Sequence, residues 1–121
     1  MKGRIGYINV HVRQFDRAVA FYRDVLGFKL KSSDAAFHFA AFDVDGMRFA
    51  VAADGPDAQD DASRPDRLTG IGIVVDDVDA AYQEMKAKGA RFTMAPSRQP
   101  WGGYMAMFAD PDGNVFYLDA E

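Results

Sequence analysis

The chain has 121 residues, of which 49% are hydrophobic and 26% are charged, and its formal net charge is −4. These values are typical of one folded domain with a hydrophobic core, and they exclude an intrinsically disordered chain. No long basic stripe is present, which argues against a nucleic-acid partner, and the absence of cysteine excludes disulfides and thiolate metal ligands.

The first predicted strand spans residues 5–12, where aliphatic and polar side chains alternate with the period of a half-buried strand. The aliphatic set is Ile8, Val10 and Val12, and the polar set is Tyr7, Asn9 and His11. One face of this strand therefore carries a phenol, an amide and an imidazole in a row.

A helix is predicted over residues 16–26, with Asp16 as its N-cap and Gly27 at the position of a C-cap glycine. A strand begins near Phe28. Two further strands, residues 36–44 and 47–52, are joined at Asp45-Gly46, a dipeptide that favours a tight hairpin. The first half of the chain is thus predicted to fold as β-α-β-β-β.

An acidic stretch rich in proline and glycine, residues 53–67, follows and is predicted to be a solvated linker. The pattern then restarts with a strand over 71–75, a helix capped by Asp76 or Asp77 and ended by Gly89, and a strand over 90–94. The last two strands flank Asp110-Pro111-Asp112-Gly113, a sequence typical of a type I turn. Two copies of one unit indicate an internal duplication, with module one at 3–52 and module two at 68–119.

The motifs, taken in this order and at this spacing, resemble the vicinal oxygen chelate superfamily, which includes glyoxalases, bleomycin-resistance proteins and extradiol dioxygenases. The matching segments are 15–22 (FDRAVAFY), 25–28 (VLGF), 75–78 (VDDV), Gly89 and 110–114 (DPDGN). The resemblance covers nearly the whole chain outside the linker. It implies an α+β fold of two βαβββ modules, whose mixed, curved sheets form a cleft, and a homodimer. Residues 1–121 would form a single domain of this kind.

Most enzymes of this family hold one divalent metal with His and Glu side chains. The resemblance puts the ligand positions of this chain at Tyr7, at Thr69 or Gly70, at Tyr117 and within 49–52. A catalytic metal site needs at least three suitable donors, and the chain has 2 His residues, neither of them at these positions. We therefore expect no metal and no cofactor.

The first candidate ligand-binding residues are Tyr7, Asn9 and His11, which the resemblance directs into the cavity. In glyoxalase-type members the position of His11 contacts the substrate, and an imidazole with a pKa near 6.5 can also act as an acid or base. The alternative is a structural histidine that forms a hydrogen bond with a neighbour in the sheet. No nucleophile or carboxylate stands beside it in the sequence, so no catalytic residue is assigned.

The other candidates are Trp101, Tyr104 and Tyr117. Trp101 and Tyr104 flank a glycine pair that allows a loop to close, so that an aromatic ring stacks on a planar or cationic group. The alternative is a tryptophan packed on the outside of the sheet. Tyr117 shares the inferred inward direction of Tyr7.

Together these features predict a metal-free protein that binds a small apolar or aromatic molecule, with sequestration of an antibiotic as one form of that function. The alternative is an enzyme: a lyase, isomerase or dioxygenase with an unconventional metal site, or one that uses His11 and the tyrosines as acid and base. An interaction module, with the acidic linker as its partner surface, is the third possibility. No apolar run approaches the roughly 20 residues of a membrane-spanning helix, and no signal-peptide core is present, so we expect a cytoplasmic protein without a membrane partner.

Overall fold

A computed structural model of the chain describes residues 1–53 and 65–120. The chain divides into two compact units, Met1–Ala62 and Ser63–Glu121, and each is described by itself. Most of the predicted acidic linker, residues 54–64, lies outside the described residues. No helix in the described part of the chain is long and apolar enough to cross a membrane.

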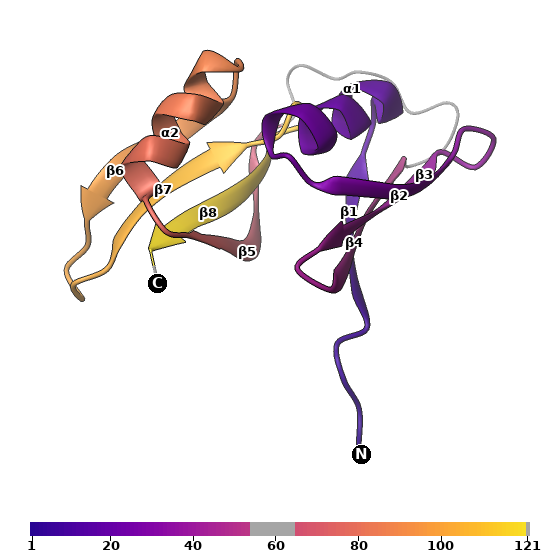
Figure 1. Cartoon of the computed structure of the whole chain (residues 1–121), viewed down its shortest axis with the longest axis horizontal. Coiled ribbons are helices and arrows are strands. Elements are labelled where there is room, and N and C mark those ends of the chain that lie inside the picture. Colours follow the sequence, from indigo (N-terminus) through magenta and orange to yellow (C-terminus); the bar gives the residue numbers. More distant parts are fainter. Residues whose placement is uncertain (54–64, 121) are drawn as a thin grey trace. The chain divides into compact units, whose positions relative to one another are not determined.

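The first unit is a four-stranded sheet with a helix on one face (Figure 1). Its elements are β1 (Tyr7–Val12), α1 (Phe15–Ala20), the π-helical turn η1 (Phe21–Val25), β2 (Lys29–Asp34), β3 (Phe39–Val44) and β4 (Met47–Ala53). The strands lie in the order β1-β4-β3-β2, and β1 is parallel to β4 whereas the other neighbours are antiparallel. The long connection through the helix and the β2–β3 hairpin allows the parallel pair to form.

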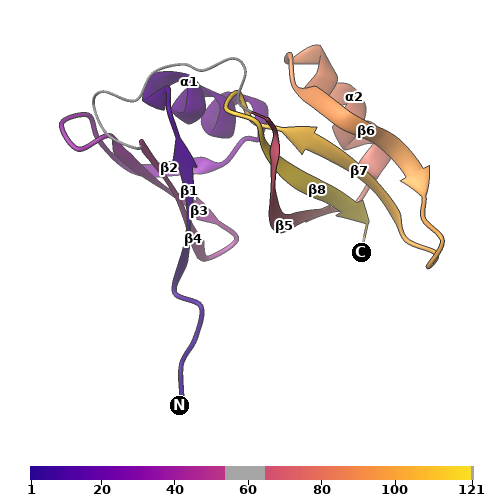
Figure 2. The ribbon, with the colours of Figure 1, turned by 180° about the vertical axis from the view of Figure 1, so that it is seen from behind.

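The second unit repeats this architecture. Its elements are β5 (Arg67–Val75), α2 (Val78–Ala87), β6 (Arg91–Arg98), β7 (Tyr104–Ala109) and β8 (Asn114–Ala120). The strand order β5-β8-β7-β6 is the same as in the first unit, and β5 is parallel to β8 (Figure 2). The prediction of an α+β chain with two βαβββ modules and mixed sheets is confirmed. Both sheets are open and uncurled, so neither encloses a cavity by itself.

The helix ends agree with the sequence prediction at three of four positions. Gly27 and Gly89 both adopt positive φ, 72° and 94°, as residues after a helix C-terminus do. Asp77 is the N-cap of α2, and its side chain accepts a hydrogen bond from the N–H of Ala80. The prediction for Asp16 is wrong: the N-cap of α1 is Gln14, two residues earlier, and it makes no side-chain cap hydrogen bond. Phe15 is buried, so core packing fixes the start of this helix.

Strand lengths differ from the prediction in two places. β3 begins at Phe39 rather than at residue 36, because the carboxylate of Asp34 accepts hydrogen bonds from the N–H groups of Ala36 and Phe37 and holds a turn. His38 leaves this turn with a φ of 50°. In the second unit β5 and β6 are longer than predicted, and both contain register shifts. Bulges let a strand continue where simple alternation breaks down.

An aromatic core joins helix and sheet in each unit. In the first unit Tyr22 is fully buried, with its ring centroid 5.1 Å from that of Phe49 and 6.1 Å from that of Phe42. In the second unit the Tyr82 ring of α2 lies 4.6 Å from Phe92, and the row continues across the sheet through Phe108 and Phe116. Each fully buried side chain of this size contributes roughly 1.5–3 kcal/mol through burial. These contacts define which face of each sheet the helix covers. The opposite face of each sheet is called its open face below.

Candidate functional site

The three polar residues of β1 share the open face of the first sheet. Tyr22 of η1 packs on Phe49 of β4, and Phe49 is in register with Ile8 of β1. Side chains alternate along a strand, so Tyr7, Asn9 and His11 project from the other face. The burial pattern agrees, since these three residues are exposed whereas Val10 and Val12 are buried.

An arginine lies against this row. Arg48 of β4 is the register partner of Tyr7, and its guanidinium carbon is 5.6 Å from the centroid of the Tyr7 ring. The same carbon is 5.4 Å from the centroid of the Phe39 ring of β3. Ala41 of β3 and Ala50 of β4 are in register with each other, and both side chains are small and buried. The methyl groups leave room for the long arginine side chain to lie along the sheet.

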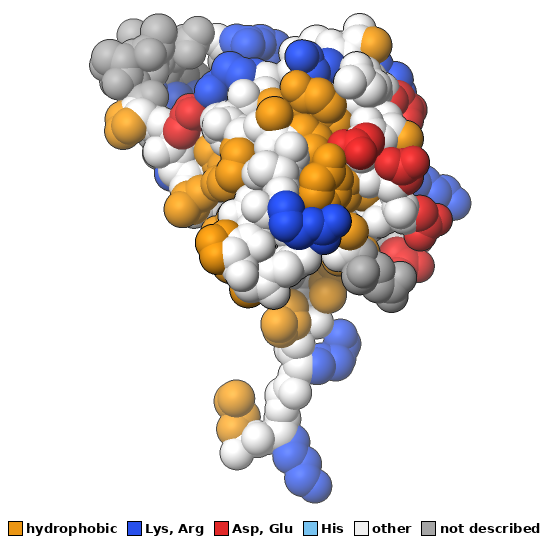
Figure 3. All heavy atoms as spheres, turned by 90° about the vertical axis from the view of Figure 1, so that its left-hand side faces the viewer, with side chains coloured by type: hydrophobic (Ala, Val, Ile, Leu, Met, Phe, Trp, Pro, Cys, Tyr) orange, Lys and Arg blue, Asp and Glu red, His pale blue; other side chains and the backbone are white. Residues whose placement is uncertain are grey.

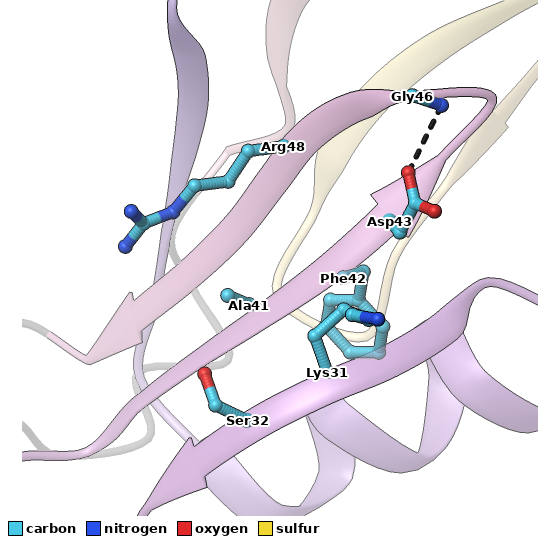
Figure 4. Close-up of a pocket in the computed structure, with 7 residues that line it drawn as sticks. All are labelled: Lys31, Ser32, Ala41, Phe42, Asp43, Gly46 and Arg48. Carbon is cyan, nitrogen blue, oxygen red and sulfur yellow. Dashed lines mark hydrogen bonds between the residues drawn. The ribbon is translucent and has the colours of Figure 1, made fainter.

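A pocket of about 340 Å³ opens beside Arg48 (Figure 4). It is lined by Lys31, Ser32, Ala41, Phe42, Asp43, Gly46 and Arg48. At its hairpin end the Asp43 carboxylate accepts a 2.9 Å hydrogen bond from the N–H of Gly46. The sequence analysis missed Arg48 and Lys31. The alternation of residues 47–52 was a usable signal for Arg48, because it puts this side chain on the face of the buried alanines rather than on that of Phe49.

In the second unit Tyr117 lies on the open face of its sheet. It is in register with Gly72 of β5 and Met107 of β7, whereas the neighbouring Phe116 belongs to the aromatic core. A Cβ at Gly72 would lie 3.9 Å from the Tyr117 Cβ, so the glycine leaves space beside the base of the phenol. Tyr117 is half-buried on this face.

Tyr104 does not share this face. It precedes Met107 by three residues in β7, and an odd spacing reverses the direction of a strand side chain. Its hydroxyl donates a 2.6 Å hydrogen bond to the Asp79 carboxylate in the first turn of α2. That hydrogen bond raises the pKa of the Tyr104 phenol above its usual value of 10.0. Tyr104 is thus held on the helix-covered face, away from Tyr117.

Trp101 projects from the turn that connects β6 and β7, and 73% of its surface is exposed. The Arg98 guanidinium donates a 2.9 Å hydrogen bond to the carbonyl of Gly102 and closes this turn. A Cβ on Gly103 would lie only 2.7 Å from the Trp101 indole nitrogen, so the glycine admits the ring. Figure 3 shows that hydrophobic side chains also appear elsewhere on the surface, with acidic side chains gathered along one edge of that view.

The Asp110–Asn114 turn is stabilised by hydrogen bonds to the buried Asp110 carboxylate from other groups of the same turn. Asp110 is only 2% exposed, and one of its carboxylate oxygens accepts hydrogen bonds from the N–H groups of Asp112 and Asn114. Its other oxygen accepts from the Asn114 side-chain amide at 2.8 Å. A buried carboxylate with several N–H donors stabilises the turn that orients β8, and hence Tyr117.

The match to the Glyoxalase/Bleomycin resistance protein/Dioxygenase superfamily covers residues 4–118. The chain belongs to this superfamily. A superfamily member from Sphaerobacter thermophilus is 31% identical, with a TM-score of 0.76 and 98% of each chain covered. A lactoylglutathione lyase from Agrobacterium tumefaciens is 21% identical, with a TM-score of 0.77 over 98% of this chain and 94% of that one. A fosfomycin resistance protein from Listeria monocytogenes is 19% identical, with a TM-score of 0.75 over 100% of this chain and 95% of that one. The last two show the shared fold alone.

The residues at the family metal positions do not suit a divalent metal. Tyr7 and Tyr117 carry phenols in place of the His and carboxylate donors that divalent metals prefer, and the Arg48 guanidinium lies against the Tyr7 ring. The Thr69 hydroxyl donates to the carbonyl of Val115 and accepts from the N–H of Ile71, which fixes it in the sheet. Within residues 1–53 and 65–120, no group of three or more His, Asp and Glu side chains is arranged to hold a metal ion. No chemical step is therefore derived through a metal.

Proposed function

We propose that this protein binds a small apolar or aromatic molecule without a metal, and that sequestration of an antibiotic is one form of this function. The observation that supports the proposal is the register pair Tyr7–Arg48, in which a guanidinium lies beside a phenol. The family resemblance puts a metal ligand at the position of Tyr7. A cation that close raises the electrostatic energy of a second, divalent cation. Aromatic rings and a few polar groups are what an organic ligand needs.

The proposed ligand-contacting residues are Tyr7, Asn9 and His11 on the first open face, with Tyr117 on the second and Trp101 at the turn. Tyr104 is left out of this set because its hydroxyl is engaged by Asp79 on the helix-covered face. The proposed location is the cytoplasm, and no cofactor is included.

The proposed assembly is a homodimer. Exposed apolar side chains lie on one edge strand of each sheet: Tyr7 of β1 is 59% exposed, and Leu68 and Val74 of β5 are 64% and 59% exposed. Apolar side chains on edge strands favour association with a second chain. Light scattering after size exclusion should give twice the 13.4 kDa chain mass. A species of 13.4 kDa would contradict the dimer.

The second candidate is an enzyme that uses acid–base chemistry. His11 is exposed on the same face as Asn9 and Tyr7, so an imidazole and a phenol flank one amide along β1. A neutral imidazole accepts a proton and a phenol donates one, which is the minimum for an isomerase or lyase step. Turnover of a bound ligand that is lost in His11→Gln but kept in Tyr104→Phe would favour this candidate over simple binding.

A thermal-shift screen of aromatic compounds tests the binding proposal. A ligand at a thousandfold excess over its Kd stabilises the folded state by about 4 kcal/mol, so hits should raise Tm by several degrees. Tyr117→Ala should remove at least half of that shift, whereas Tyr104→Phe, which removes a phenol from the other face, should keep it. Equal shifts in both variants would contradict the assigned face. Elemental analysis is the second arm, and one tightly bound divalent ion per chain would overturn the metal-free proposal.

A further inference from the structure

We propose that Arg48, assisted by Lys31, recognises the carboxylate of a small aromatic acid on the open face of the first sheet. This inference rests on the proposed binding function and narrows it to an anionic class of ligand. It is carried by the first unit alone, through the position of Arg48, the pocket beside it and the charges that line that pocket.

The Arg48 guanidinium is held in place without using its hydrogen-bond donors. It contacts two aromatic rings, at 5.6 Å from the Tyr7 centroid and 5.4 Å from the Phe39 centroid. In the described residues Arg48 takes part in no hydrogen bond and no ion pair. An arginine has five N–H donors in a planar fork that matches a carboxylate. The two rings restrict the side chain in advance, so that less conformational entropy is lost when a ligand binds.

Other arginines of the chain are used differently. Arg91 forms a bidentate ion pair with Asp66, at 2.8 and 3.0 Å, and Arg23 is paired with Asp24 at 2.8 Å. These two side chains already have a carboxylate partner from the chain itself. Arg48 forms no ion pair with Asp43, its register partner in β3, and its guanidinium contacts two aromatic rings instead, so its N–H donors are available to a ligand carboxylate.

Lys31 lies on the open face by simple alternation. Lys29 pairs with Asp43, and Lys31 follows Lys29 by two residues, so its side chain is on the face of Asp43 and Arg48. Leu30 pairs with Phe42 and Ser32 pairs with Ala41, so the bulge at Lys31 puts Ser32 on the open face as well. Lys31 lines the pocket together with Arg48 (Figure 4), and it has no ion-pair partner in the described part of the chain.

The charge balance of the pocket favours an anion. Its charged lining groups are Lys31, Arg48 and Asp43, which sum to a positive charge. One oxygen of Asp43 is engaged by the N–H of Gly46, and Asp43 is in register with Lys29 of β2 and with Arg48 of β4. The single acid is thus held at the hairpin end of the pocket, whereas the Arg48 guanidinium is directed away from it, toward the rings of Tyr7 and Phe39 (Figure 4).

The size and shape of the site specify the class of ligand. A volume of about 340 Å³ lies at the small end of ligand pockets, which span roughly 300–1,000 Å³. The apolar floor is formed by Ala41 and Phe42, and two aromatic rings flank the Arg48 guanidinium. These features fit a flat molecule of one or two aromatic rings with one carboxylate. The ring would contact the apolar floor, and the carboxylate would accept two hydrogen bonds from the Arg48 guanidinium.

The test compares 2-naphthoate with 2-naphthamide, which have the same ring and differ in charge. Titration of the full ¹⁵N-labelled chain is followed by amide chemical shifts, which detect millimolar binding and locate it. Naphthoate should shift the amides of residues 31–32 and 41–48, and naphthamide should bind about tenfold or more weakly, since a hydrogen bond to a charged group is replaced by a neutral one. Arg48→Gln should weaken naphthoate by a similar factor and leave naphthamide unchanged, and Arg48→Lys should restore only part of the affinity because it lacks the fork.

The matched control is Arg23→Gln, which removes the same charge from η1, on the helix-covered side of the unit, and should leave the affinity for naphthoate unchanged. Equal affinity for the acid and the amide, or an effect of Arg23→Gln as large as that of Arg48→Gln, overturns the inference while small-molecule binding stands. Shifts confined to residues outside 31–32 and 41–48 overturn the location. If neither compound shifts any amide at millimolar concentration, this inference is overturned, whereas binding of other aromatic compounds in the thermal screen decides the proposed function separately.

Discussion

The hydroxyl of Tyr104 in β7 and the carboxylate of Asp79 in α2 are joined by a 2.6 Å hydrogen bond that ties the last hairpin of the second unit to its helix. The residue that looked like a pocket aromatic in the sequence therefore links helix to sheet. This hydrogen bond raises the pKa of the Tyr104 phenol, because donation to a carboxylate favours the protonated form.

The first prediction concerns the alkaline side of the stability profile. The folded-state pKa of Tyr104 lies above the unfolded value of about 10, so its stabilisation is fully present below pH 10 and is lost as pH rises through the folded pKa. Absorbance at 295 nm should show a late-ionising phenol in the wild type that is missing from Tyr104→Phe. Asp79→Asn should return this tyrosine to the ordinary range. An unchanged titration in Asp79→Asn would contradict the assigned cause.

The second prediction concerns the ion pair Asp66–Arg91. Hydrogen bonds from Arg91 hold the pKa of Asp66 below its usual value of 3.8. The folded-state pKa is depressed, so this stabilisation is present above about pH 4 and is lost as pH falls through the folded pKa. Both side chains are substantially exposed, and we expect Arg91→Gln to cost only about 0–1 kcal/mol at pH 7. Urea unfolding at pH 7 and at pH 3 should give a smaller difference between variant and wild type at the lower pH.

Two glycines with the same backbone angle provide the third prediction. Gly113 and Gly46 have φ values of 85° and 84°, but a Cβ on Gly113 would lie 2.8 Å from the Asp66 carboxylate, whereas nothing lies within 4 Å of one on Gly46. Gly46→Ala should cost about 1–2 kcal/mol from backbone strain alone. Gly113→Ala adds displacement of Asp66 and loss of its ion pair, so its unfolding midpoint in urea should fall further. Equal losses would show that Asp66 moves aside freely.

The fourth prediction compares equivalent acids in the two units. Asp110 is buried and its carboxylate accepts three hydrogen bonds, whereas Asp43, at the corresponding place before Gly46, is partly exposed and accepts one from the N–H of Gly46. Orphaned buried donors cost about 1–3 kcal/mol each. Asp110→Ala should therefore lower the free energy of unfolding by more than about 2 kcal/mol, and Asp43→Ala by about 1 kcal/mol or less. Similar losses at both positions would contradict the special role of the buried turn.

Local signals in the sequence predicted most of the fold. Alternation identified β1, glycine after each apolar helix stripe fixed both helix ends, and Asp-Gly at residues 45–46 and 112–113 marked the β3–β4 and β7–β8 hairpins. Each of these features depends on the backbone preference or period of a few adjacent residues, which is why a sequence carries them. The wrong prediction also concerned a few adjacent residues. Asp16 is not the N-cap of α1, because the helix starts at the buried Phe15, before Asp16.

The residue pattern alone predicts the duplicated βαβββ architecture and the shared face of Tyr7, Asn9 and His11. It also has no His, Asp or Glu at the positions where the family resemblance puts the metal ligands. The pairing of strands and helices in three dimensions is needed to show that Tyr104 faces α2 and that Lys31 lines the pocket beside Arg48. These outcomes depend on strand register, and the bulge in β2 puts Ser32 on the same face as Lys31. Pairing between strands is set by residues far apart in the chain. No local pattern therefore predicts that Tyr104 forms a hydrogen bond with Asp79, or that the Arg48 guanidinium contacts aromatic rings.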